Sequence, residues 1–231
     1  MRLVHSFVSW GIRLGTSILC RIDGAELTRV PMRGPLILAV NHINSLEVPL
    51  LFAHLQPRRM IGLAKIETWD SKFMGWLFDL WEAIPIRRGE ADLDALRRCL
   101  TALSAGDILG VAPEGTRSYD GRLLSGQPGI VLIALHSGAP ILPVAHWGGE
   151  DFSKNLKCFK RTEIHIRVGE PFSLDSKGVK VNAKVRQAMV DEIMYQIAIL
   201  MPEEYRGQYA NFTPPPQQYL RFPYRKLRGV P

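Results

Sequence analysis

The amino-acid sequence predicts a single α/β domain with a mixed, mainly parallel β-sheet flanked by helices. Short apolar runs bounded by turn-forming residues, such as residues 36–40 and 108–112, have the pattern of strands that are buried on both faces. Segments with apolar residues at three- and four-residue spacing, such as residues 90–105, alternate with these runs and predict amphipathic helices. A chain of 231 residues is long enough to form one such domain with a full core.

The first twenty residues predict an amphipathic helix that precedes this domain. Its apolar stripe consists of Leu3, Phe7, Trp10, Leu14 and Ile18. A tryptophan flanked by arginines suits a helix that lies in a membrane interface, and packing of the stripe on the domain is the alternative. Arg13 interrupts the apolar run and no small-residue cleavage pattern follows, so we do not expect a signal peptide. No uninterrupted run reaches the roughly 18 apolar residues of a transmembrane helix.

The other elements follow in order along the chain. We expect strands at residues 36–40, 60–64, 83–86, 108–112, 140–144 and 164–168. We expect helices at residues 46–55, 73–81, 90–105, 130–137 and 181–201. Prolines 214–216 exclude a regular helix near the end of the chain, where cations dominate. We therefore divide the chain into an N-terminal membrane-associating helix (1–24), a central domain (25–201) and a Pro-rich basic tail (202–231).

The charge of the chain indicates an anionic partner. The formal net charge is +7 and the isoelectric point is about 9.5. An anionic membrane surface, a phosphorylated substrate and nucleic acid are the classes that this charge favours, but the sequence contains no nucleic-acid-binding motif. Cys20, Cys99 and Cys158 are scattered and form no pair of the kind that binds a metal, so we expect a reduced, cytoplasmic protein without a metal site.

The first candidate active-site residue follows the strand at 36–40. His42 falls at the carboxyl end of that strand, where open α/β sheets bind their ligands. Glu47 stands five residues later, and a turn between strand and helix can fold its carboxylate onto the imidazole. Such a contact fixes the tautomer and raises the basicity of the other ring nitrogen, as a general base requires. A hydrogen-bonded structural histidine is the alternative.

The segment after the strand at 108–112 has the same build. Residues 113–118 read Pro-Glu-Gly-Thr-Arg-Ser and place a carboxylate, a glycine, two hydroxyls and a guanidinium at a strand end. Gly115 allows the backbone to approach a ligand closely, and Arg117 together with backbone N–H groups suits a phosphate. A capped turn with a surface arginine is the alternative.

Together, these two segments resemble the motifs of the glycerolipid acyltransferase family. That family carries Asn-His, four residues and Asp, and later Phe-Pro-Glu-Gly-Thr-Arg-Ser. The first motif corresponds here to Asn41-His42 with Glu47, and the second to residues 112–118. Two weaker family motifs follow in the expected order at residues 83–88, which end in Arg88, and at residues 141–144. The resemblance extends over roughly residues 25–172.

The resemblance implies transfer of a fatty acyl group from an acyl thioester to the free hydroxyl of lysophosphatidic acid, which gives phosphatidic acid. His42 would remove the hydroxyl proton, and Glu47 would orient His42 and stabilise its imidazolium. The substrate-binding residues that the resemblance implies are Arg88, Glu114, Gly115, Thr116 and Arg117. Backbone N–H groups of residues 114–116 would stabilise the oxyanion, and Arg117 assisted by Arg88 would hold the phosphate.

The same resemblance bears on partners and location. The acyl donor would be acyl-CoA or acyl carrier protein, with no further cofactor, and the protein would lie on the cytoplasmic face of a membrane as a peripheral or monotopic protein. Glycerol 3-phosphate and other lysolipids stay open as acceptors. A hydrolase that uses the His–carboxylate pair on a thioester or phosphoester is a second function. A non-enzymatic basic module on an anionic membrane or nucleic acid is a third.

The sequence departs from the family pattern at two positions. Glu47 replaces the family's aspartate, which adds one methylene between the backbone and the carboxylate. A geometric error on the order of 1 Å can lower a rate about a hundredfold. Gln127 stands where many relatives have lysine, which removes one cation that could bind an anionic substrate.

Overall fold

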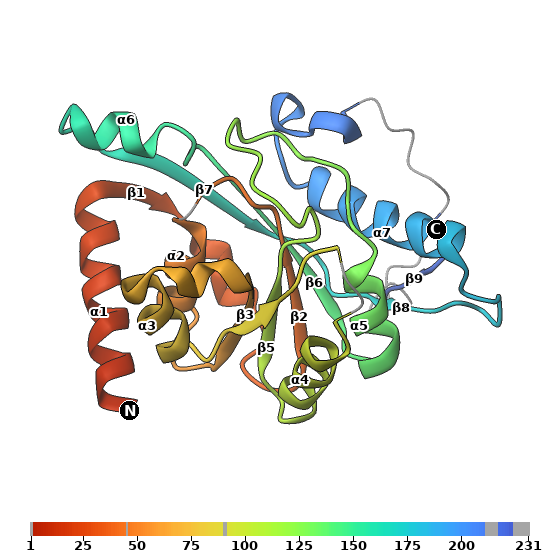
Figure 1. The fold of residues 1–231 in the computed structure, drawn as a ribbon. Helices are drawn as coiled ribbons and strands as arrows, with labels where there is room; N and C mark the ends of the chain where they lie inside the picture. Colours follow the sequence, from red (N-terminus) through yellow and green to blue (C-terminus); the bar gives the residue numbers. More distant parts are fainter. Residues whose placement is uncertain (1, 45, 90–91, 211–216, 224–231) are drawn as a thin grey trace.

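A seven-stranded β-sheet forms the centre of the computed structural model, which describes residues 2–44, 46–89, 92–210 and 217–223 (Figure 1). The strands are β1 (Cys20–Asp23), β2 (Leu36–Val40), β3 (Met60–Lys65), β4 (Ile84–Ile86), β5 (Ile108–Val111), β6 (Ile141–Trp147) and β7 (Thr162–Val168). Their order in the sheet is β1-β7-β6-β2-β5-β3-β4, and only the β6–β7 pair is antiparallel. The mixed, mainly parallel sheet that the sequence predicts is confirmed.

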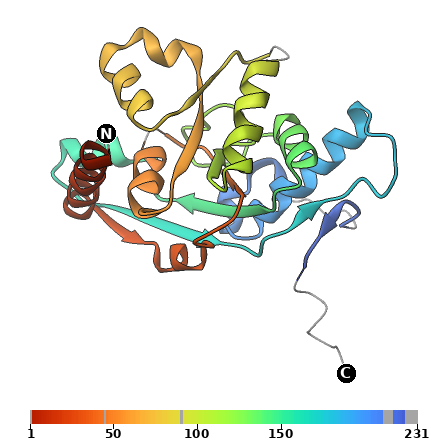
Figure 2. The ribbon, with the colours of Figure 1, turned by 90° about the horizontal axis from the view of Figure 1, so that it is seen from below.

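Helices cover both faces of this sheet (Figures 1 and 2). One face carries α1 (Arg2–Leu19), α2 (Glu47–His54) and α3 (Lys72–Leu80). The other face carries α4 (Leu93–Ser104), α5 (Gly129–Ser137) and α7 (Ala183–Ala198). Alternate side chains of β2 explain this arrangement, because Leu36 and Leu38 pack in the first layer and Ile37 and Ala39 in the second. The short helix α6 (Phe152–Lys157) precedes β7 at one end of the molecule.

The helices begin and end where local chemistry allows it. The side chain of Asp92 caps α4 by accepting the N–H of Ala95, and Asn182 caps α7 in the same way through Val185. Gly138 ends α5 in the left-handed conformation, with φ of 65°.

Strand register brings the two candidate motifs to the same edge of the sheet. Five neighbouring strands, from β6 to β4, run parallel, so their carboxyl ends meet there. The end of β2 lies between its two neighbours, because Ala39 pairs with Val111 of β5 and Val40 with Val144 of β6. The residues that follow these strands therefore surround one site.

The N-terminal helix docks on the domain through a face that carries Ser9, Ile12, Arg13 and Thr16. Arg13 donates hydrogen bonds to the carbonyl oxygens of Ala53 and His54 at the end of α2, at 2.8 and 3.2 Å. The four members of the apolar stripe whose side chains the structure describes are exposed, and Phe7 and Trp10 are 72% and 59% exposed. The alternative that this stripe packs on the domain is wrong. No helix among the described residues is both long and apolar enough to cross a bilayer.

Much of the C-terminal stretch belongs to the domain. Two 3₁₀ turns, at Glu203–Tyr205 and Gly207–Tyr209, follow α7, and β9 (Leu220–Arg221) pairs with β8 (Ser173–Leu174). Tyr209, Tyr219 and Leu220 are buried in the core beside α7. The prolines at 214–216 and the basic end at 224–231 lie outside the described residues.

Candidate active site

The turn after β2 brings Glu47 onto His42. Oε1 of Glu47 forms a hydrogen bond with Nδ1 of His42, and Oε2 accepts the backbone N–H of Asn44 at 3.2 Å. The side chain of Glu47 is 5% exposed and that of His42 is 15% exposed. A carboxylate can only accept, so Nδ1 carries the proton and Nε2 offers its lone pair. The pairing expected from the sequence is present, whereas its catalytic role stays a prediction.

The surroundings of Glu47 favour its charged form. Burial by itself raises the pKa of this carboxyl, but the hydrogen bond with His42 and the nearby imidazoles of His146 and His42 outweigh burial and hold the pKa below its ordinary value. Glu47 is therefore a carboxylate at neutral pH and can stabilise an imidazolium at His42.

The side chain of Glu114 accepts hydrogen bonds from two backbone N–H groups. Its side chain is 3% exposed, and its two oxygens accept the N–H groups of His42 and Leu124, both at 2.8 Å. Burial raises the pKa of Glu114 to about 7, although the two N–H donors oppose this shift. The observed task of Glu114 is to hold the backbone of His42 against the turn after β5. The direct contact with substrate that we expected from Glu114 stays a prediction.

Further backbone contacts join the two turns. Ser118 and Tyr119 donate N–H groups to the carbonyl oxygens of His42 and Ile43, at 2.9 and 3.1 Å. Gly115 has φ of 68°, a conformation that favours glycine, and its N–H donates to the carbonyl oxygen of Ala112 at 3.1 Å. This N–H is one of the groups expected to stabilise an oxyanion, and in the structure it already donates a hydrogen bond within the turn.

Two cavities meet beside these turns. The first, of about 390 Å³, is lined by His42 and by three cationic side chains, Lys65, Arg88 and Arg117. Residues of α3, including Leu77 and Phe78, form an apolar wall of this cavity. Among the described residues, none of the three cations takes part in an ion pair. The structure thus places Arg88 and Arg117 around the same space as His42, as the sequence predicts.

The second cavity, of about 650 Å³, lies between α4 and α5. It shares Leu63, Arg88 and Thr116 with the first cavity, and its walls are mostly apolar. Glu114, Gly115 and Gln127 line this cavity and are absent from the lining of the first. The substrate-binding residues proposed from the sequence are therefore divided between two spaces that meet at Leu63, Arg88 and Thr116.

Sequence reasoning missed His146, which is buried near the carboxyl end of β6. Its backbone N–H and carbonyl oxygen bond to the side-chain amide of Asn41, both at 2.9 Å, and its Nε2 donates to the carbonyl oxygen of Asn41 at 2.8 Å. Burial lowers the pKa of His146, although the charge of Glu47 opposes this, and the ring is neutral at neutral pH. His146 lies two residues beyond the strand predicted at 140–144, and a histidine just past a strand end was the available signal.

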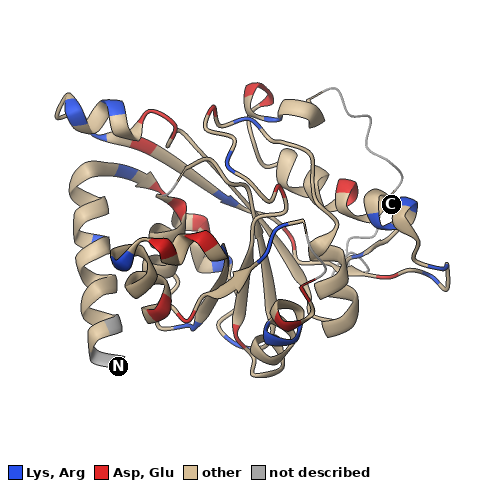
Figure 3. Ribbon diagram, viewed as in Figure 1, with Lys and Arg blue, Asp and Glu red and all other residues tan. Residues whose placement is uncertain are grey.

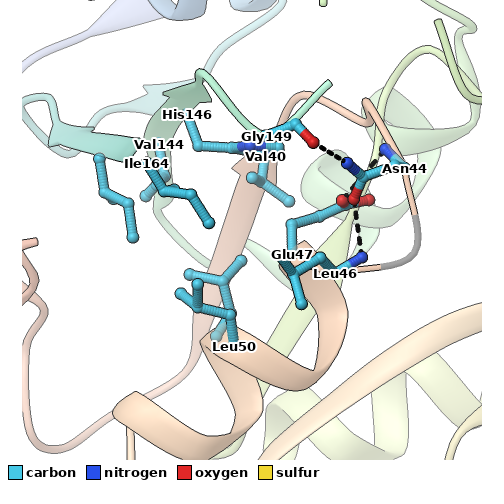
Figure 4. A pocket seen from close by; sticks show the side chains of 11 residues that line it. Val40, Asn44, Leu46, Glu47, Leu50, Val144, His146, Gly149 and Ile164 are labelled. Atoms are coloured by element: carbon cyan, nitrogen blue, oxygen red, sulfur yellow. Dashed lines mark hydrogen bonds between the residues drawn. The ribbon is translucent and has the colours of Figure 1, made fainter. Parts of the chain in front are cut away.

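Asn44 completes the support of Glu47 (Figure 4). Its side chain accepts the N–H of Leu46 at 2.8 Å and donates to the carbonyl oxygen of Gly149 at 2.6 Å. Asn44, Glu47 and His146 line part of a small cavity of about 10 Å³, together with the other side chains drawn in Figure 4. This volume is about that needed for one water molecule. Among the described residues no group of three or more His, Cys, Asp or Glu side chains is placed to hold a metal ion.

Fold and site together define an acyltransferase, and comparison with known proteins establishes the family. The family model described as Acyltransferase matches residues 21–147, which is more than half of the chain. The chain therefore belongs to the acyltransferase family, and the resemblance seen in the two motifs is confirmed. The reading of the chain as a non-enzymatic basic module is correspondingly set aside.

Individual relatives give the comparison more detail. The chain is 26% identical over 193 residues to the 1-acyl-sn-glycerol-3-phosphate acyltransferase of Bacillus subtilis, covering 84% of this chain and 94% of that protein. It is 29% identical over 175 residues to the lyso-ornithine lipid O-acyltransferase of Pseudomonas aeruginosa, covering 68% and 66%. The crystal structure of the 1-acyl-sn-glycerophosphate acyltransferase of Thermotoga maritima has the same fold, with a TM-score of 0.60, 22% identity, and coverage of 83% of this chain and 77% of that chain.

Proposed function

We propose that the protein transfers an acyl group from an acyl thioester to the free hydroxyl of lysophosphatidic acid and so makes phosphatidic acid. The observation that carries this proposal is the cavity that places His42, the histidine of the His–carboxylate pair, beside three cations. Such a cavity suits an acceptor whose reactive hydroxyl lies close to a phosphate. The name of the Bacillus subtilis relative, a 1-acyl-sn-glycerol-3-phosphate acyltransferase, supports the same acceptor.

The reaction needs one general base and no covalent acyl-enzyme. Nε2 of His42 takes the proton of the acceptor hydroxyl as the hydroxyl oxygen attacks the thioester carbonyl carbon. Glu47 stabilises the imidazolium that results. When the tetrahedral intermediate collapses, the C–S bond breaks and the leaving thiolate takes the proton back from His42. The base is thereby regenerated without any change in oxidation state.

Oxyanion stabilisation comes from the turn at residues 114–116, beside the place where the two cavities meet. The N–H of Gly115 is bonded to Ala112, so the donors that we assign are the backbone N–H groups of Glu114 and Thr116 and the hydroxyl of Thr116. Donors fixed in place before the reaction stabilise a developing charge without reorganisation.

Arg88, Arg117 and Lys65 bind the acceptor phosphate. An arginine can bind phosphate through two parallel N–H bonds, whereas lysine acts as a point charge. Gln127, which replaces a family lysine, lines the other cavity, so this replacement removes no cation from the space that contains His42. The departure at position 127 is therefore compatible with a phosphorylated acceptor.

The apolar wall of the first cavity accommodates an acyl chain. Met74, Leu77, Phe78 and Trp81 line it, and Phe73 and Trp76 are exposed on the same helix. An exposed aromatic rim beside an apolar wall gives a lipid tail a continuous path from the bilayer to His42. The donor is acyl-CoA or acyl carrier protein, without any further cofactor.

The exposed stripe of α1 attaches the protein to an anionic membrane surface. A bilayer interface buries apolar side chains that water leaves exposed, and Trp10 suits the headgroup level. We assign a peripheral position on the cytoplasmic face, where the lipid acceptor is available.

A thiol-release assay tests the proposal. Wild-type protein, His42→Ala and the control His136→Ala are compared with acyl-CoA and with acyl carrier protein as donors, with and without lysophosphatidic acid. His136 is an exposed histidine of α5 outside both cavities. We expect acceptor-dependent release that falls roughly a thousandfold or more in His42→Ala and stays unchanged in His136→Ala. Release that needs His42 but ignores the acceptor would identify a hydrolase, and release with lyso-ornithine lipid alone would reassign the acceptor.

A further inference from the structure

The turn between α6 and β7 ends in an exposed aromatic ring. The N–H of Phe159 donates to the carbonyl oxygen of Leu156 at 3.2 Å, and the N–H of Lys160 donates to that of Asn155 at 2.9 Å. These two hydrogen bonds define a Schellman motif, in which the residue after the helix cap takes the left-handed conformation and is usually glycine. In this protein the residue is Phe159, with φ of 53° and a side chain that is 99% exposed.

The stability of the fold does not explain a phenylalanine at this position. The left-handed conformation is unfavourable for a bulky side chain because Cβ approaches the backbone. An exposed ring also gains nothing from burial, which is the main stabilising contribution of aromatic residues in a folded protein. An unfavourable backbone conformation that carries an exposed apolar group indicates a partner outside the chain.

Three lysines lie close to Phe159 in the sequence. Lys154, Lys157 and Lys160 are exposed, and the segment 152–161 contains no acidic residue. Among the described residues, none of these three lysines forms an ion pair. Figure 3 shows the positive charge of α6 at one end of the molecule. An apolar tip on a segment that carries unpaired cations complements a surface that is negative outside and apolar beneath.

The same turn is attached to the N-terminal helix. Arg161 donates hydrogen bonds to the carbonyl oxygens of Ser17, in the last turn of α1, and of Cys20, the first residue of β1. Ile18, in the exposed stripe of α1, is 61% exposed. Both ribbon views place α1 and α6 beside each other at the same end of the molecule (Figures 1 and 2). The tip of α6 is therefore held in a defined position relative to the stripe of α1.

We infer that the tip of α6 is a second membrane-contact site, which binds an anionic lipid surface. Phe159 enters the interface while Lys154, Lys157 and Lys160 contact lipid phosphates. Aromatic residues favour the interface, and cations near an anionic bilayer add an attraction that salt weakens. Two contacts on one rigid body, α1 and this tip, bind more tightly than either alone and determine how the protein is oriented. The inference rests on the proposed function only in that the same membrane supplies the acceptor.

Phe159→Gly is the decisive variant, because glycine is the preferred residue for this conformation. The melting temperature should stay the same or rise. Binding to vesicles of phosphatidylcholine and phosphatidylglycerol should weaken roughly tenfold, since the buried apolar contact is lost. A variant that melts lower and binds vesicles normally would assign Phe159 a structural role and overturn the inference.

A charge-reversal pair tests the cations. Lys157→Glu with Lys160→Glu is compared with Lys177→Glu with Lys180→Glu, which makes the same change of charge in the exposed loop between β8 and α7, at the opposite end of the molecule (Figure 1). The first pair should bind anionic vesicles at least about tenfold more weakly at low salt, and the second pair less than about twofold. Equal losses in both pairs would mean that only net charge matters and would overturn the site.

Activity measurements separate this inference from the proposed function. With acyl-CoA and a short-chain, water-soluble lysophosphatidic acid, the tip variants should keep wild-type turnover, since neither Phe159 nor the lysines line either cavity. Wild-type protein without acyltransfer but with tip-dependent vesicle binding would refute the proposed function alone. A raised KM for acyl carrier protein with unchanged vesicle binding would show that an acidic protein docks on the tip instead, which also overturns the inference.

Discussion

Glu47 and Glu114 are two buried carboxylates that contact the same residue in different ways. Glu47 bonds to the imidazole of His42, whereas Glu114 bonds to its backbone N–H. Their environments move the two pKa values in opposite directions, below the ordinary value for Glu47 and up to about 7 for Glu114. The role of each buried carboxylate therefore depends on the atoms with which it forms hydrogen bonds. Glu47 can stabilise the charge that develops on the imidazole during the reaction, and Glu114 fixes the position of the His42 backbone.

Among the substitutions that test this difference between the two carboxylates, Glu47→Gln should have the largest effect on kcat. The amide keeps the shape of the side chain but carries no charge, so it cannot stabilise the imidazolium or select the tautomer. We expect kcat to fall roughly a thousandfold with little change in the KM for lysophosphatidic acid. Steady-state kinetics with varied acceptor measure both. A fall of less than about tenfold would remove Glu47 from the chemical step.

Arg117→Ala should have the next largest effect and should separate binding from chemistry. Arg117 belongs to the same turn as Glu114 but lines the cavity that contains His42. Loss of a charge-assisted contact to phosphate should raise the KM for lysophosphatidic acid roughly tenfold to a hundredfold and leave kcat nearly unchanged. Arg122→Ala, an exposed arginine outside both cavities, is the control. An unchanged KM would place the phosphate elsewhere.

Glu114→Gln should lower kcat by only about tenfold, because it weakens the backbone support of His42 and leaves the His–carboxylate pair intact. A glutamine can accept only through its one oxygen, so one of the two N–H groups loses its partner. Steady-state kinetics with varied acceptor measure this change in kcat. A loss as large as that of Glu47→Gln would contradict the division of roles between the two carboxylates.

Glu114 should also give the stability a pH dependence. The folded protein keeps the Glu114 proton up to about pH 7, whereas the unfolded chain releases it near the ordinary value of 4.5. Between these values the folded state binds more protons, so raising the pH through this window lowers the free energy of unfolding. The full loss, on the order of 3 kcal/mol, is reached above pH 7. In urea unfolding, the free energy of unfolding of wild type minus that of Glu114→Gln should therefore be larger at pH 5 than at pH 8. A difference independent of pH would contradict the raised pKa.

His146→Gln should have the smallest kinetic effect, a few-fold in kcat with KM unchanged. Glutamine can still donate to the carbonyl oxygen of Asn41, while the backbone contacts to the Asn41 side chain stay. His146→Ala leaves that buried carbonyl without its partner and should lower the free energy of unfolding by about 1–3 kcal/mol. Thermal and urea unfolding should show that His146→Ala is less stable than His146→Gln. Equal stability of both variants would show that the ring of His146 carries no structural role.

The two motifs show how much of the site could be predicted from sequence. His42, Arg88 and Arg117 follow strand ends, and a parallel sheet brings such ends together whatever the details of packing. Glu47 begins the helix after β2, and a turn folds it back onto His42. The task of Glu114 could not be predicted, because a carboxylate in a turn can face a ligand or a backbone N–H with the same local sequence. The direction of the α1 stripe was likewise open, since amphipathicity does not say which face meets the domain.

By itself, the sequence determined the order of the elements, the carboxyl-edge position of both motifs and the family. These follow from periodicity and from residue types over short distances in the chain. Only the tertiary structure decided that Glu114 holds His42 and that His146 holds Asn41, because these contacts join residues 72 and 105 positions apart. They exist because β2 lies between β5 and β6, and this strand order follows from packing of the whole sheet, which no local pattern contains.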